Sequence, residues 1–351
     1  MLDRTGLSAQ IRRPWIQRRK LGADCEDLGV TGFTLAHFSD PHLGPLPPAR
    51  WRELANKRLT GFFSWSSNRV KIHKPAVLKL LVDDLKEQAP DHTAITGDLV
   101  NISLPQEFVA AAKWLETVGT ADKVTIIPGN HDAYVNMPWD QSLALWATYM
   151  RGTRYASTVE TLPGGSEDFP FVRRLGPVAL IGTSTAVPMP PFIAAGRLGE
   201  NQLTRLCEQL KRLGDERLFR IVLIHHPPFS GGAYKRKSLL DAKEFQEVLA
   251  LAGAELVLHG HTHVSGLSRI PSPGGPIPVI GVPSASAVAA GRKDPARYHL
   301  YTVSRNADSW HLEVEIRGLC KTQDAFERQG SMALMIPLVS STPFATAGAA
   351  A

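Results

Sequence analysis

Apolar and polar residues alternate in short segments through most of the chain, and this pattern predicts strands interleaved with helices. β-Branched and apolar runs predict strands at 34–38, 92–96, 124–127, 178–183, 220–224, 255–258, 278–281, 298–304 and 310–316. Apolar positions three and four apart predict helices at 75–88, 105–118, 140–150, 201–213 and 241–251. The first helix is well marked, because Pro75 suits its first turn and Val77 and Leu81 repeat on one face.

The order of these elements predicts an α/β fold. Early strands alternate with helices, which favours parallel pairing, whereas the late strands follow one another directly. We therefore expect a four-layer αββα sandwich, in which two mixed β-sheets are flanked by helices, in one domain over residues 31–318. Residues 1–30 are basic with little apolar periodicity, and 319–351 end in small residues. Both are expected to be disordered.

Composition is that of a globular protein, with 43% hydrophobic and 21% charged residues. We find no run of about 18 apolar residues of the kind that spans a membrane. The three cysteines, Cys25, Cys207 and Cys320, are too widely spaced for a disulfide framework or a zinc ribbon. We expect a cytoplasmic protein, with peripheral contact to the inner face of a membrane left open.

Side chains that can bind metal follow five of the predicted strands. They are Asp40 and His42, then Asp98, then Asn130, His131 and Asp132, then His225 and His226, and finally His261 and His263. Each set alone is typical of a surface turn. Strands that end together would gather the sets at one rim, and carboxylates, an amide carbonyl and imidazoles suit divalent metals. The combination therefore predicts a metal site.

The same residues resemble the motifs of the calcineurin-like metallophosphoesterases. The matching segments, within residues 33–316, are Asp40-x-His42, Gly97-Asp98, Gly129-Asn130-His131-Asp132, His225-x-Pro227 and Gly260-His261-x-His263. A further stretch, Gly196–Leu203, is similar to the bacterial cyclic-nucleotide-phosphodiesterase-like branch. The resemblance implies the metallophosphatase fold and two divalent metals, which the donor types leave open as Mn, Fe, Zn or Co.

The resemblance also implies roles for individual residues. Asp40, His42 and His263 would hold one metal, Asn130, His225 and His261 the other, and Asp98 would bridge them. A metal-activated water would be the nucleophile. His131 would be the general acid or stabilise charge on the leaving oxygen, and Asp132 would either orient His131 or cap a helix.

The other histidines are assigned with less direct evidence. His225 and His226 are adjacent, so they point to opposite sides, and the motif favours His225 as the ligand. His226 and His259 are expected beside the metal ligands or at the substrate. The rest are expected on strands or at the surface, and they are His37, His73, His92, His299 and His311.

Residues 45–75, here called the basic insert, lie between the first two sets of candidate ligands. Their seven basic residues and one acidic residue give an excess of six, which equals the formal net charge of the whole chain. Trp51, Leu59, Phe62, Phe63 and Trp65 lie among these charges. The pattern fits a packed cap helix, or a lid for a phospholipid-like substrate or an anionic membrane. Nucleic acid fits less well, because the basic stretch is short.

The sequence thus favours a metal-dependent phosphodiesterase that uses a metal-activated water, with His131 as general acid. The alternatives left open are a UDP-sugar-lipid pyrophosphatase of the lipid A type, a phosphomonoesterase, a nuclease and a non-catalytic metal-binding scaffold. His131 argues against a scaffold, because a scaffold does not need an uncoordinated imidazole beside the metals.

Overall fold

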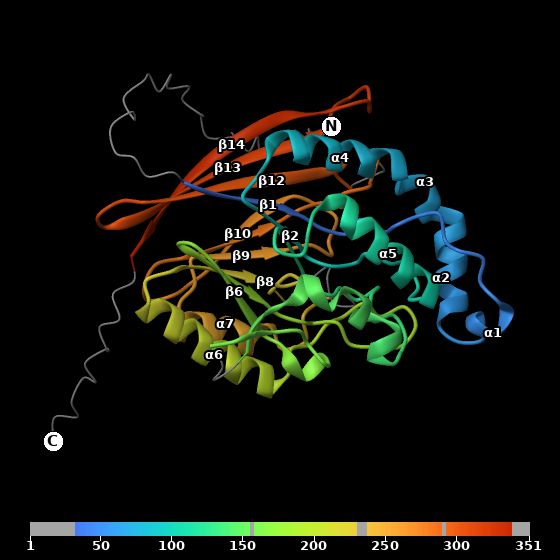
Figure 1. Cartoon of the computed structure of the whole chain (residues 1–351), viewed down its shortest axis with the longest axis horizontal. Coiled ribbons are helices and arrows are strands. Elements are labelled where there is room, and N and C mark those ends of the chain that lie inside the picture. The colour runs from blue at the N-terminus through green and yellow to red at the C-terminus, as the bar shows by residue number, and fades with distance from the viewer. Residues whose placement is uncertain (1–31, 155–157, 230–236, 290–292, 339–351) are drawn as a thin grey trace, which may run out of the picture. The chain divides into compact units, whose positions relative to one another are not determined.

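Two β-sheets form the central layers of the computed structural model, which describes residues 32–154, 158–229, 237–289 and 293–338 (Figure 1). One sheet has six strands in the order β14-β13-β12-β1-β2-β3, and the other has eight in the order β10-β11-β9-β8-β7-β6-β4-β5. The expected extension at residues 1–30 lies outside the described residues.

The strand and helix bounds agree with most of the predicted elements. The six-stranded sheet contains β1 (Phe33–Phe38), β2 (His92–Ile95), β3 (Val124–Ile126), β12 (Arg297–Arg305), β13 (Ser309–Leu319) and β14 (Phe326–Pro337). The eight-stranded sheet contains β4 (Gly152–Thr153), β5 (Glu160–Thr161), β6 (Phe171–Leu175), β7 (Val178–Gly182), β8 (Phe219–Leu223), β9 (Leu256–His259), β10 (Gly266–Ile270) and β11 (Ile277–Gly281). The long helices are α4 (Pro75–Gln88), α5 (Pro105–Val118), α6 (Glu200–Asp215) and α7 (Ala242–Ala252).

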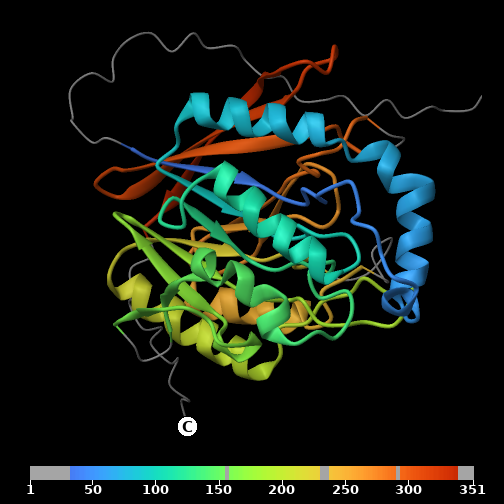
Figure 2. The same ribbon diagram turned by 45° about the vertical axis from the view of Figure 1, so that its right-hand side comes forward.

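Both sheets are mixed, as predicted. Strands β1, β2 and β3 pair in parallel, whereas β12 joins β1 antiparallel. In the other sheet β7, β8, β9 and β11 are parallel. Strand β6 pairs antiparallel with β7, and β10 pairs antiparallel with β11. Helices α4 and α5 cover the first sheet, and α6 and α7 cover the second (Figure 2). The predicted αββα sandwich is confirmed.

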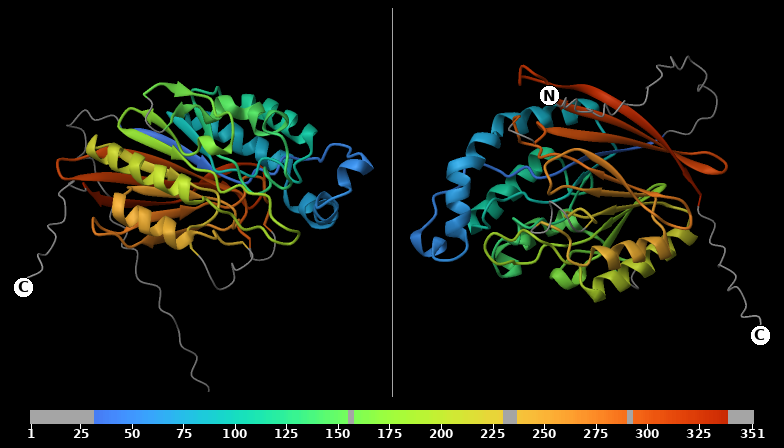
Figure 3. Two further views of the ribbon diagram at one scale, coloured as in Figure 1. Left: turned by 90° about the horizontal axis from the view of Figure 1, so that it is seen from below. Right: turned by 180° about the vertical axis from the view of Figure 1, so that it is seen from behind.

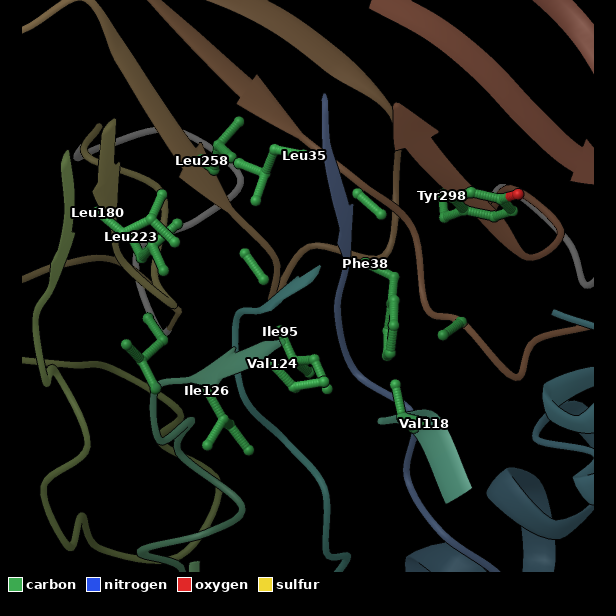
Figure 4. Packing of buried hydrophobic residues seen from close by; sticks show 14 of the residues in the cluster. Leu35, Phe38, Ile95, Val118, Val124, Ile126, Leu180, Leu223, Leu258 and Tyr298 are labelled. Atoms are coloured by element: carbon green, nitrogen blue, oxygen red, sulfur yellow. The ribbon is translucent and has the colours of Figure 1, made fainter. Parts of the chain in front are cut away.

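Alternate residues of the central strands supply two separate cores. Leu180, Leu223 and Leu258 point toward Leu35 in the space between the sheets (Figure 4). The intervening residues face the other way and pack under α6 and α7, and they include Ile181, Val222 and Val257. This period of two, with both faces buried, is what a sheet between two apolar layers requires.

The expected disorder of residues 319–351 is wrong for β14. That strand pairs antiparallel with β13 along its whole length. Met332, Leu334 and Ile336 alternate with more exposed residues and pack against the core, so the strand has a period-two pattern that the small-residue composition of the tail obscured. Residues 339–351 lie outside the described part of the chain.

The helix predicted at 140–150 is also different. The chain forms 3₁₀ turns at Trp139–Gln141 and Leu143–Met150 instead of an α-helix. Leu143, Trp146 and Tyr149 are buried at a spacing of three, which matches the three residues per turn of that helix type.

The basic insert consists of short helical segments that project beside the layers (Figure 3, blue). They are α1 (Trp51–Leu54), α2 (Arg58–Ser64), a π-helical turn (Trp65–Arg69) and α3 (Val70–Ile72). Among the described residues, we find no helix that combines the length and the apolarity needed to cross a bilayer.

We predict that the ion pair between Arg220 and Glu255 is essential for stability. Their side chains are 3% and 4% exposed, and Arg220 Nη2 lies 2.7 Å from Glu255 Oε1. Glu255→Gln leaves a buried cation without its counter-charge, so the free energy of unfolding should fall by about 3 kcal/mol in urea denaturation. Glu216→Gln is the control, because its ion pair with Arg174 is 36–39% exposed, and it should cost at most about 1 kcal/mol. Equal losses for the two variants would contradict the prediction.

Candidate metal centre

The candidate ligands lie on loops that follow β1, β2, β3, β8 and β9. Strands β1, β2 and β3 are parallel neighbours, as are β8 and β9, so their carboxyl ends meet at one rim. Backbone bonds join the first two loops: the Asp40 N–H donates to Gly97 O at 3.0 Å, and the His42 N–H donates to Asp98 O at 3.1 Å. The rim therefore brings together residues that are distant in the sequence, as in the 2.9 Å bond from the His261 N–H to Asp40 Oδ2, which joins residues 221 positions apart.

Several candidate ligands have an unusual backbone. Asp40, His42, Asp98, His261 and His263 have φ values between 43° and 68°. Residues other than glycine seldom adopt this left-handed conformation, which costs on the order of 1–3 kcal/mol each and is concentrated at functional sites. Five strained backbone positions around one cluster of side chains therefore indicate a functional site.

Two glycines allow the loops after β2 and β3 to touch. Gly97 has φ 91°, and a Cβ atom on it would collide with the backbone of Gly129. A Cβ atom on Gly129 would collide with Asp98 and lie 2.7 Å from His225 Cε1. The two loops thus pack backbone against backbone, which brings Asp98 close to Asn130.

The buried side chains form three overlapping groups, each with ligand atoms within 4.8 Å of one another. The groups are Asp40, His42 and Asp98, then Asp98, His225 and His261, and then His42, His73 and His263. Asp98 belongs to two of them, and its Oδ2 lies 3.4 Å from His225 Nε2 and 3.8 Å from His42 Nε2. Asn130 Oδ1 lies 3.2 Å from His225 Nε2. All seven predicted ligands are therefore adjacent.

The ring nitrogens have the orientation that a metal site needs. His225 Nδ1 donates to Thr96 O at 2.6 Å, and His42 Nδ1 donates to Val100 O at 3.3 Å, so their Nε2 atoms face the cluster. His42 Nε2 and His263 Nε2 are 3.4 Å apart. His261 Nδ1 lies 3.3 Å from His225 Nε2, so this nitrogen faces the cluster. The mixed nitrogen and oxygen donor set fits a divalent metal.

Burial and neighbouring charges set the protonation of the cluster. Burial lowers the pKa of His42 and of His261 well below the usual value, so both imidazoles are neutral and able to bind metal. Burial also acts to lower the pKa of His225, but Asp98 outweighs it and raises that pKa to about 9. For Asp98 the burial penalty is outweighed by His225 and His131, and its pKa is lowered. A divalent cation bound here would replace the proton that His225 shares with Asp98.

His131 lies beside this cluster, but Asp132 does not orient it. The Asp132 carboxylate accepts the backbone N–H groups of Asp98, Val100 and Gly129 at 2.8–3.0 Å. The expectation that Asp132 fixes the His131 ring is therefore wrong, because its oxygens are used to hold the two loops together. The ring is fixed instead by Nδ1, which donates to Asn101 O at 2.5 Å. Burial, and then the charge of Arg69, lower the pKa of His131 to about 3.

His226 lies beside the cluster, but its ring nitrogens contact residues outside the candidate ligand set. Its Nδ1 lies 2.7 Å from Thr185 Oγ1 and its Nε2 lies 3.2 Å from Ala194 O, so the geometry favours His225 as the ligand. Its ring centroid is 4.3 Å from that of His261. His259 is buried behind the site, with Nδ1 3.0 Å from Gly260 O.

Three residues at the site were missed from the sequence. His73 was expected on a strand or at the surface, but it is buried, with its ring centroid 4.7 Å from that of His42. Arg69 Nη2 lies 2.7 Å from His131 Nε2, and Lys293 Nζ lies 3.2 Å from His263 Nδ1. For His73 and Arg69, which belong to the basic insert, the one signal in the sequence was the density of basic residues there.

Two solved phosphatase structures have a similar fold. A dimetal phosphatase from Danio rerio aligns over 88% of this chain and 100% of its own, with a TM-score of 0.52 and 14% identity. A purple acid phosphatase from yellow lupin (Lupinus luteus) seeds aligns over 87% of this chain and 54% of its own, with a TM-score of 0.55 and 14% identity. At these identities the likeness concerns the fold.

Sequence comparison identifies the family. A protein of Synechococcus sp. (strain ATCC 27144 / PCC 6301 / SAUG 1402/1), described as a probable cyclic nucleotide phosphodiesterase, is 28% identical over 183 residues, which are 51% of this chain and 60% of that protein. Residues 33–265 match the model of the calcineurin-like phosphoesterases, and this range contains every candidate ligand. The chain therefore belongs to the calcineurin-like phosphoesterase family.

Proposed function

We propose that this protein is a dinuclear metal-dependent phosphodiesterase. The observation that carries the proposal is the pair of ligand groups that share Asp98 at the rim of the two sheets. Asp40, His42 and His263 would hold one metal, and Asn130, His225 and His261 the other. Manganese, iron, zinc or cobalt would suit this donor set. His73 contacts the first group and is a further candidate ligand or a neutral neighbour of it.

The metals, when bound, would supply Lewis acidity that activates water and offsets phosphate charge. The residues of the chain would position the substrate and handle the leaving group. His131 is held through Nδ1 by Asn101 O, so its Nε2 faces outward, where Arg69 contacts it. Arg69 opposes protonation of this ring. An anionic phosphate beside Arg69 would offset that charge and allow His131 to protonate the leaving oxygen.

A diester is favoured over a monoester by two likenesses. The Synechococcus relative is described as a probable cyclic nucleotide phosphodiesterase, and Gly196–Leu203 is similar to that branch. The chain spans 60% of the length of that relative, so its activity is carried over only as part of this proposal. The following measurements distinguish this diesterase from a phosphomonoesterase and from a non-catalytic scaffold.

The basic insert supports a second, peripheral role. Arg58 is buried and bonds to Ile102 O and Ser103 O, and Lys57 Nζ lies 4.1 Å from the centroid of the Tyr134 ring, so these two cations anchor the insert. Arg52 and Lys71 are exposed, together with Trp51 (74%) and Phe63 (64%). Exposed aromatic residues among cations suit an anionic membrane surface or a phospholipid-like substrate. We propose contact of this kind at the inner face of a membrane, from the cytoplasm.

The first prediction from this proposal concerns turnover. Protein stripped of metal and supplied with Mn²⁺ should hydrolyse bis-p-nitrophenyl phosphate faster than p-nitrophenyl phosphate. His131→Ala should lower kcat for the diester by roughly 10²–10⁴-fold, because the leaving oxygen loses its proton donor, while metal content stays unchanged. His311→Ala, on β13 away from the rim, is the control and should retain full activity. Faster monoester cleavage would favour the phosphomonoesterase, and full activity of the His131 variant would refute its role.

The second prediction concerns metal binding. Asp98→Ala should weaken retention of metal by at least about tenfold and abolish turnover, because the shared carboxylate is lost. Metal content after dialysis, measured by plasma mass spectrometry, tests this. Asp308→Ala removes an exposed carboxylate elsewhere and should change nothing. Retention of two metals by the Asp98 variant would exclude a bridging role, and two metals in a wild-type protein that cleaves no phosphate ester would favour the scaffold.

The third prediction concerns membranes. Arg52→Glu with Lys71→Glu should weaken binding to phosphatidylserine-rich vesicles by roughly tenfold or more, because each basic residue near the surface contributes about 1 kcal/mol. Co-sedimentation measures this. Lys211→Glu with Lys321→Glu changes net charge equally on exposed residues outside the insert, and should have little effect. If both double variants behave alike, the insert has no specific role.

A further inference from the structure

We propose that Arg69 and Lys293 form a cationic pair that binds the phosphate group of the substrate at the metal centre. Arg69 comes from the basic insert, and Lys293 lies in the segment before β12. The inference rests on the proposed function and assigns it two residues that the family motifs do not include.

The guanidinium of Arg69 has N–H groups that no acceptor among the described residues uses. Its Nη1 and Nη2 lie 3.1 Å and 2.7 Å from the two ring nitrogens of His131. His131 Nδ1 uses its proton to donate to Asn101 O, so Arg69 can donate only to Nε2. A guanidinium has five N–H donors, and the side chain is half-buried at the rim. In the described part of the chain no oxygen atom accepts from Arg69.

Four other buried or half-buried arginines differ from Arg69 in this respect. Arg58 and Arg173 donate to backbone carbonyls, and Arg220 and Arg317 donate to carboxylates. Each of these four guanidiniums joins two parts of the fold through oxygen acceptors. Arg69 contacts an imidazole instead, which is a weaker partner for a cation, so its free donors suit an anionic ligand better than a structural cross-link.

Lys293 approaches the cluster from another segment. Its Nζ lies 3.2 Å from His263 Nδ1, and among the described residues no carboxylate lies within ion-pair distance of it. The side chain is half-buried. Burial lowers the pKa of both side chains, and the charge of Asp40 acts in the opposite direction on both, so both lie within range of the same cluster.

The two contacts place one cation at His131 and the other at His263, a candidate metal ligand. The planar fork of Arg69 suits two oxygens of one phosphate, whereas the ammonium of Lys293 acts as a point charge. The pair would hold the oxygens that the metals leave free and offset negative charge on the leaving oxygen. It also gives the insert a direct part in substrate binding, besides any contact with a surface.

Binding of inorganic phosphate to Mn²⁺-loaded protein tests the proposal by isothermal titration calorimetry, without reliance on turnover. Arg69→Met and Lys293→Met should each weaken phosphate affinity by roughly 10- to 100-fold, the range for loss of a charged hydrogen bond. Arg69→Lys should give an intermediate loss, because it keeps the charge but not the fork. Lys211→Met and Lys321→Met are controls that remove exposed cations outside the insert, and they should bind phosphate like the wild type. Metal content should be equal in all variants.

Unchanged phosphate affinity in both methionine variants would overturn the proposal, and so would a loss that is explained by lower metal content. If Arg69→Met fails to fold, Arg69→Lys and Lys293→Met still decide it. Diester hydrolysis is measured in parallel. Phosphate binding that depends on Arg69 in a protein that cleaves no ester would support the cationic pair and refute the proposed function. Active protein with Arg69-independent binding would do the reverse.

Discussion

The rest of the site depends on the interactions of the buried Asp98 carboxylate. Its Oδ1 accepts the His131 N–H at 2.7 Å, and its Oδ2 faces His225 and His42. One side chain thus ties together the loops after β1, β2, β3 and β8. A buried carboxylate is costly unless positive charge or hydrogen bonds surround it. Here that requirement is met by the imidazoles of His225 and His42 and by the backbone amide of His131, and the imidazoles are also suitable metal ligands.

The fold and the candidate ligands could be predicted because their signals are local. Each ligand follows a strand whose apolar run is read directly from the sequence, and parallel strands that end together bring the ligands to one edge. His73, Arg69 and Lys293 could not be found in this way. They reach the cluster from the insert and from the segment before β12, neither of which carries a ligand motif, so only tertiary packing determines their neighbours. The same limit applies to Asp132, since no sequence pattern distinguishes a carboxylate that accepts backbone amides from one that orients a ring.

The basic insert shows why a local charge excess is ambiguous in a sequence. Its cations look equivalent in the sequence, yet the structure gives them three different surroundings. Arg58 and Lys57 fix the insert to the body, Arg69 contacts His131, and Arg52 and Lys71 remain exposed. Anchoring on one side and exposure on the other would allow a single short segment to fill both proposed roles, at the substrate and at a surface.

The contact between Gly97 and Gly129 has a consequence for protein engineering. Because no side chain fits between the two loops, the spacing of Asp98 and Asn130 is fixed by backbone alone. Libraries that seek new substrates should therefore leave both glycines unchanged, since even alanine would force the loops apart. Diversity belongs in the insert, where exposed positions can vary without moving any candidate ligand.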